Sequence, residues 1–182
     1  MDIFYICRMQ KFSIHKALEV LEQTPDTLNS FLKDLSDNWI FFNEGEETWS
    51  PFDVVGHLIH GEKTDWIQRL NKILFEDDKH FLPFDRFAQF ENSKGKSLQD
   101  LLHEFTILRE ENIALVKSLN LSENDLEKKG IHPEFGEVTA KQLLATWVTH
   151  DLGHISQIAR VMAKQYKKEV GPWTAYISIL KT

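Results

Sequence analysis

Two histidines, His150 and His154, have the spacing of a metal-chelating pair. Residues four apart in a helix lie one turn apart on the same face, so both imidazoles can reach one divalent ion. The chain contains eight histidines, however, and a pair at this spacing arises readily by chance. The residue after His150 is Asp151 rather than glutamate, which argues against a protease of the HExxH type. Spacing alone is therefore weak evidence for a metal site.

The segment that carries the pair is predicted to form one long helix from Thr139 to Tyr166. Thr139 followed by Gln142 matches a capping box. Apolar residues at helical spacing share a stripe with the two histidines: Leu143, Trp147, Ile158 and Val161. Burying two neutral imidazoles on such a stripe costs free energy unless each ring nitrogen finds a partner, and a metal ion is one such partner.

A second helix is predicted over residues 50–75, because a serine cap and a first-turn proline begin it. His57 lies nearly opposite the apolar side of this helix, in line with Gly61. Taken alone, the helix favours a solvent-facing His57, and a recessed pocket beside Gly61 is the alternative. If this helix faces the histidine pair, either His57 or His60 would provide the third nitrogen.

The remaining pattern predicts an all-α fold, a four-helix bundle. Helices are predicted over residues 13–23, 25–35 and 97–119, with a break or kink near Thr24 because proline inside a helix costs about 3 kcal/mol. The connections are predicted as a loop at 37–49, an irregular crossover at 80–96 packed by its phenylalanines, a helical turn within 122–129, a small hairpin within 130–139 and a short closing helix.

Composition limits the classes of function. The net charge is −7 with scattered basic residues, so neither nucleic acid nor an anionic membrane is the expected partner. No stretch is long and apolar enough to span a membrane. The single cysteine, Cys7, cannot form an intramolecular disulfide and is consistent with a reducing cytoplasm, so a cytoplasmic location is expected.

Several long segments resemble the DinB-like superfamily of bundle proteins. They are TPDTL, TWSPFDVVGHLIHGEKTDWIQR, PFDRF, HPEFGEVTAKQLLATWVTHDLGHISQIARVMAKQY and VGPW. The resemblance implies one bundle domain over residues 12–182 with a long crossover, and leaves residues 1–11 as an N-terminal extension. It also implies that His57, His150 and His154 hold a metal ion, which favours the pocket alternative for His57.

Three protein ligands leave a coordination position open, which is the pattern of a catalytic metal. The ion would be zinc, nickel, iron or manganese, and it would activate either a water or a small-molecule thiol that attacks an electrophile. Characterised members of the superfamily resemble low-molecular-weight thiol S-transferases, which favours a metal-dependent transferase; a hydrolase is the alternative. A non-enzymatic, metal-stabilised stress or interaction protein is a third hypothesis.

Other side chains are weaker candidates. Asp151 adjoins His150 and is a minor candidate for polarising a ligand, although its place on the helix favours the flank of the site. Glu62, Lys63, Asp65 and Arg69 are interpreted as ion pairs on an exposed surface. Trp173 and Tyr176 near the end of the chain are candidates for a homodimer contact or for a cap on their own core.

Overall fold

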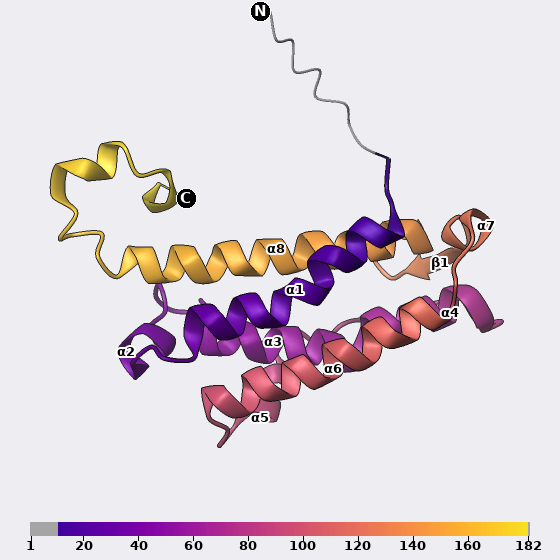
Figure 1. Ribbon diagram of the computed structural model, residues 1–182, viewed down its shortest axis with the longest axis horizontal. Coiled ribbons are helices and arrows are strands. Elements are labelled where there is room, and N and C mark those ends of the chain that lie inside the picture. Colours follow the sequence, from indigo (N-terminus) through magenta and orange to yellow (C-terminus); the bar gives the residue numbers. More distant parts are fainter. Residues whose placement is uncertain (1–10, 182) are drawn as a thin grey trace, which may run out of the picture.

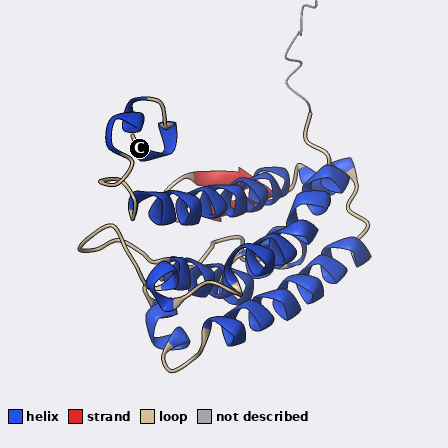
Figure 2. Ribbon diagram, turned by 60° about the vertical axis from the view of Figure 1, so that its left-hand side comes forward, coloured by secondary structure: helices blue, strands red, loops and turns tan. Residues whose placement is uncertain are grey.

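The computed structural model describes residues 11–181. Cys7 and nearly all of the predicted extension at residues 1–11 lie outside this range. Four long rods lie side by side (Figure 1, Figure 2). They are α1 (Ile14–Leu32), α3 (Pro51–Thr64) continued by α4 (Trp66–Phe75), α6 (Leu98–Ser118) and α8 (Ala140–Lys164). The predicted four-helix bundle is confirmed.

Short elements connect the rods, and two more follow the last rod. They are α2 (Asp37–Ile40), α5 (Ala88–Ser93), α7 (Glu123–Leu126), the strands β1 (Lys129–His132) and β2 (Gly136–Thr139), and the 3₁₀ helices η1 (Gly171–Ala175) and η2 (Ser178–Leu180). The strands form the predicted antiparallel hairpin, in which Lys129 lies opposite Thr139. Within residues 11–181, no helix is long and apolar enough to cross a membrane.

The rods surround a shared interior. Both α1 and α3 pack against α6 and α8. In Figure 1, α3–α4 and α6 run in the same direction, because the connection between them carries the chain back along the bundle. This is the predicted long crossover, and its short helix α5 packs on α3.

Three of the predicted helix starts, at Ser50, Ser97 and Thr139, are confirmed by their hydrogen bonds. At the start of α3, the Ser50 hydroxyl accepts from the Asp53 N–H, and the Asp53 carboxylate accepts from the Ser50 N–H. The same reciprocal arrangement opens α6 and, through Thr139 and Gln142, α8. Each box satisfies N–H groups that a helix start would otherwise leave unpaired.

A buried polar layer divides the apolar interior into two clusters. One cluster includes Leu21, Trp66, Ile113 and Trp147, and the other includes Leu28, Ile59, Phe105 and Ile158. Between them on α3, α6 and α8 lie three charged residues, Glu62, Arg109 and Asp151, whose side chains are almost completely buried. Burying charges costs free energy unless they are paired and hydrogen-bonded, so the contacts of these residues decide how the rods align.

Arg109 of α6 provides those contacts. Its guanidinium donates to both Asp151 carboxylate oxygens, at 2.6 and 3.1 Å, and to Glu62 Oε1 at 2.8 Å. Glu62 Oε1 also accepts from the Trp147 indole at 3.1 Å. Burial alone would lower the pKa of Arg109, but the Glu62 and Asp151 carboxylates raise it above its ordinary value. The layer therefore contains a permanent cation between two carboxylates.

Of the predicted break or kink near Thr24, the break is wrong, because α1 is continuous through Pro25. Proline lacks the N–H that would bond to the carbonyl four residues earlier, which is that of Leu21. Arg109 donates to the Leu21 carbonyl oxygen at 2.9 Å and replaces the lost helix bond. The tertiary structure thus compensates for the proline, and local sequence cannot show this.

Other differences concern interruptions and connections. The predicted helix over residues 50–75 is interrupted at Asp65, whose backbone is non-helical (φ −120°, ψ −74°). In a regular helix Gly61 and Trp66 would lie about 140° apart, yet a Cβ at Gly61 would lie 3.1 Å from the Trp66 indole nitrogen. The interruption therefore brings Trp66 over Gly61. The predicted loop at 37–49 contains α2, and the crossover contains α5.

The aromatic residues of the connections also differ from prediction. Of the four crossover phenylalanines, only Phe81 is buried, and Phe87 and Phe90 are exposed. The closing segment is 3₁₀ rather than α-helical, and Trp173 and Tyr176 are 67% and 87% exposed. These two residues therefore do not cap their own core.

We predict that Arg109→Met lowers the free energy of unfolding by about 3–5 kcal/mol, because it leaves two buried carboxylates without their cation. It also leaves the Leu21 carbonyl without its donor. Urea denaturation followed by circular dichroism measures the change. Lys117→Met, which removes an exposed ion pair with Glu22, is the matched control and should change stability little. A similar loss in both variants would show that the layer does not carry this stabilisation.

Candidate metal centre

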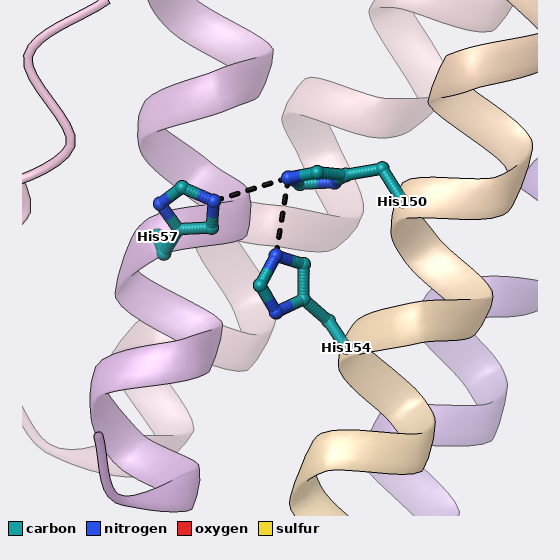
Figure 3. A group of neighbouring side chains, drawn as sticks. All are labelled: His57, His150 and His154. Atoms are coloured by element: carbon teal, nitrogen blue, oxygen red, sulfur yellow. Dashed lines mark hydrogen bonds between the residues drawn. The ribbon is translucent and has the colours of Figure 1, made fainter. Parts of the chain in front are cut away.

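Three histidine side chains meet between α3 and α8. Figure 3 shows His57 from α3 pointing toward His150 and His154 from α8. The Nε2 atom of His150 lies 3.1 Å from the Nε2 atoms of both His57 and His154. One nitrogen from each ring lies within 4.8 Å of the others, so the three residues form a group that could hold a metal ion. The sequence pattern on α3 favoured a solvent-facing His57, but the side chain is buried.

Aromatic rings enclose the three histidines. Trp49 packs on His57 with ring centroids 4.8 Å apart, and Phe84 meets the same imidazole edge-on at 5.5 Å. Trp66 lies 5.1 Å from the His150 ring. These contacts fix the ring planes and exclude water from the sides of the group.

The hydrogen bonds of the rings fit a metal site. His154 Nδ1 lies 2.8 Å from Gln157 Oε1. An amide oxygen only accepts, so Nδ1 carries the proton and Nε2 presents its lone pair to the other histidines. Within the described residues, the buried Nδ1 atoms of His57 and His150 have no hydrogen-bond partner. Three converging Nε2 atoms cannot all satisfy one another, whereas one cation between them would satisfy all three.

The electrostatics keep these imidazoles neutral, which is the form that binds metals. Burial lowers the pKa of His57 to about 3, assisted by electrostatic repulsion from His154, His60 and Arg86. Burial chiefly lowers the pKa of His150 to about 2. It also lowers the pKa of His154, against the opposing effects of Gln157 and Asp151.

A cavity of about 670 Å³ gives access to the group. Its lining includes all three histidines, and its walls combine aromatic residues from four parts of the chain with two arginines: Trp49, Trp66, Phe84, Phe135, Arg69 and Arg86. The volume is in the range of small-molecule sites. The three-histidine group therefore lies at a cavity and not in a sealed core.

The structure places the weaker candidates elsewhere. Asp151 faces away from the cavity, fully buried against Arg109, as its predicted flank position suggested. His60 is buried beside Phe84, and its ring nitrogen lies 3.4 Å from the Thr64 hydroxyl rather than among the three histidines. His103 is exposed on α6.

The expectation of exposed ion pairs on the second helix is wrong for three of its four residues. Glu62 is buried and pairs with Arg109 of another helix. Asp65 and Arg69 pair at 2.6 Å, but both side chains are largely buried at the cavity wall. Desolvation raises the pKa of Asp65 to about 6, against the opposing charge of Arg69. Lys63 alone forms a pair at the surface, but with Glu104 of α6 rather than with a neighbour on its own helix.

Sequence reasoning missed several cavity residues. Trp49 and Arg86 lie in connections without a periodic pattern, and although both fall in segments that resemble the superfamily, those segments alone did not indicate a place at the site. Gln157 could have been found, since it lies three residues after His154 on the same helix face, within reach of the far ring nitrogen.

Fold and site together define a class: a four-helix bundle in which α3 and α8 bring three histidines to an open cavity. The chain belongs to the DinB superfamily, whose family model matches residues 20–158. This match includes all three histidines. A search of the curated proteins gave no match.

Two solved structures share the fold. YfiT from Bacillus subtilis superposes with a TM-score of 0.73 at 22% identity, over 86% of this chain and 91% of YfiT. It is described as "a probable metal-dependent hydrolase with an unusual four-helix bundle topology". The four-helix bundle protein TT2238 superposes with a TM-score of 0.50 at 18% identity, over 80% of this chain and 97% of TT2238.

We predict that the metal-free protein loses stability as the pH falls from about 6.5 toward 3. The unfolded chain protonates His57 and His150 near their ordinary pKa of 6.5, whereas the folded chain does so only near 3 and 2. The unfolded state therefore binds more protons in this window. As the pH falls, the free energy of unfolding decreases by up to about 1.4 kcal/mol per pH unit for each ring. Urea denaturation of the chelator-treated protein at several pH values should show a shallower slope for His57→Gln; equal slopes would contradict the prediction.

Proposed function

We propose that this protein is a metal-dependent enzyme in which His57, His150 and His154 bind one divalent ion, zinc, nickel, iron or manganese. The observation that carries the proposal is the convergence of three neutral Nε2 atoms at the floor of a cavity. Three protein ligands leave a coordination position open for a water or substrate molecule, as in catalytic rather than structural sites. The metal, when bound, would lower the pKa of a guest water or thiol and so supply a nucleophile near neutral pH.

The residues around the group have definable roles in this proposal. Gln157 keeps the His154 proton on Nδ1, so that Nε2 faces the ion. Trp49, Trp66 and Phe84 exclude water from the sides and leave approach through the cavity. Asp65, which pairs with Arg69 at the cavity wall, can take up and release a proton near neutral pH, since its pKa is about 6.

Hydrolysis of a small-molecule substrate is the first reaction class. The description of YfiT as a probable metal-dependent hydrolase supports it by structural analogy. The second candidate is transfer of a small-molecule thiol to an electrophile. It is favoured by a second cavity, of about 820 Å³, that adjoins the first through Trp49 and Arg86, because such a reaction seats two substrates.

We predict that the purified protein carries about one divalent ion per chain and that His150→Ala removes it while the bundle remains folded. The substitution deletes one of three ligands but leaves Asp151 and Arg109 in place. Elemental analysis and circular dichroism measure the two properties. The exposed His103→Ala is the matched control and should retain the metal. Full metal content in His150→Ala would show that the ligand assignment is wrong.

We also predict that the Co²⁺-loaded protein responds to a small thiol such as 2-mercaptoethanol with a sulfur-to-cobalt charge-transfer band. An open coordination position on the metal permits thiol binding. An ion that only joins two helices, with every coordination position occupied by protein, does not. A spectrum insensitive to thiols and to pH would favour the non-enzymatic alternative. Assays of ester and amide hydrolysis, and of thiol addition to an electrophile, then separate the two reaction classes.

A further inference from the structure

We propose that Arg86 is the substrate-recognition residue of this site and that it binds a carboxylate group of the small-molecule substrate. The inference rests on the proposed function and specifies its substrate class. It is carried by the placement of one unpaired guanidinium where two cavities meet beside the three histidines.

Arg86 differs from the other arginines of residues 11–181. Arg69 pairs with Asp65, Arg109 with Glu62 and Asp151, and Arg160 with Glu44. Within that range, Arg86 forms neither a hydrogen bond nor an ion pair, and its guanidinium lies only over the Phe87 ring, 4.9 Å from the centroid. Its five N–H donors are therefore free for a ligand.

The position of Arg86 suits a ligand that reaches the histidines. It lines the 670 Å³ cavity together with all three histidines, and it also lines the adjoining 820 Å³ cavity. A substrate with its reactive end at the histidines can thus place a charged end at Arg86.

The connection that carries Arg86 is fixed on both sides. Before it, Phe81 is buried against Gly130, where a Cβ would lie 2.4 Å from the Phe81 ring, and the Phe81 N–H donates to the Ile131 carbonyl. After it, Gln89 of α5 is 1% exposed. A side chain on an anchored connection loses less freedom on binding than one on a loose loop.

The nearby carboxylates leave Arg86 available. Asp85, its neighbour in sequence, accepts from the Phe87 N–H at 3.0 Å. Asp65 is neutralised by Arg69, and Glu44 by Arg160 and Lys164. Of the other carboxylates, Glu134 lines the 670 Å³ cavity and Glu47 lines the 820 Å³ cavity. A single planar guanidinium matches one planar carboxylate in a bidentate arrangement.

The test uses the Co²⁺-loaded protein and matched pairs of metal-binding probes. Mercaptopropionate and longer mercaptocarboxylates are titrated beside their primary amides, and the charge-transfer band gives each Kd. The wild-type protein should prefer the carboxylate of a suitable length. In Arg86→Gln the ratio of carboxylate to amide affinity should fall about five- to tenfold, while the amide affinity stays the same. Arg86→Lys should retain part of the preference for the carboxylate, because lysine keeps the positive charge but lacks the paired N–H donors of the planar guanidinium.

The control removes one positive charge from the same connection. Lys94 is exposed and lines neither cavity, so Lys94→Gln should keep the wild-type ratio. Unchanged thermal melting of Arg86→Gln would show that the fold is intact. If both members of each pair bind but the ratio is the same in wild type and Arg86→Gln, Arg86 does not recognise the carboxylate and the inference is wrong. If no probe reaches the cobalt ion, the open metal site itself is wrong, and the inference falls with it.

Discussion

A buried guanidinium needs hydrogen-bond partners from the protein, and in this fold the partners of the Arg109 Nη1 and Nη2 groups bring all four rods together. Its buried Nε–H has no partner within the described residues. Arg109 extends from α6 and receives Glu62 from α3, Asp151 from α8 and the Leu21 carbonyl from α1. Sliding any one of these helices by a turn would leave a buried charge or carbonyl unpaired, at a cost of several kcal/mol. The polar layer therefore fixes helix register in a way that interchangeable apolar contacts do not.

This register also sets the position of the candidate metal centre. Asp151 follows His150 directly in α8, and Glu62 lies five residues after His57 in α3. Because Arg109 binds both carboxylates, it fixes how far the two histidine-bearing helices are displaced along each other. The same residue stabilises the passage of α1 through Pro25. A carboxylate that adjoins a histidine in sequence can thus serve the site through helix alignment, without facing the cavity.

Features set by neighbouring residues could be read from the sequence. The capping boxes, the hairpin and the histidine pair of α8 each depend on residues at most a few positions apart. His57 was placed in the site by family resemblance, because the α3 pattern alone favoured solvent. Pro25, Glu62 and Asp65 were misread for a common reason. Their compensating contacts come from another helix or from a backbone interruption, and a helical pattern contains neither. Arg86 and Trp49 lie in aperiodic connections, so only the folded chain shows that they adjoin the histidines.

The division of the interior into two clusters has a consequence for how the chain folds. Each cluster draws residues from all four rods, Leu21, Trp66, Ile113 and Trp147 on one side and Leu28, Ile59, Phe105 and Ile158 on the other. No contiguous fragment contains a complete half of the core, so neither half can act as an autonomous folding unit. Nearly the whole polypeptide must be synthesised before either cluster can close. The crossover between parallel rods adds contacts of long sequence separation, which favours slow, all-or-none folding over stepwise growth from one end.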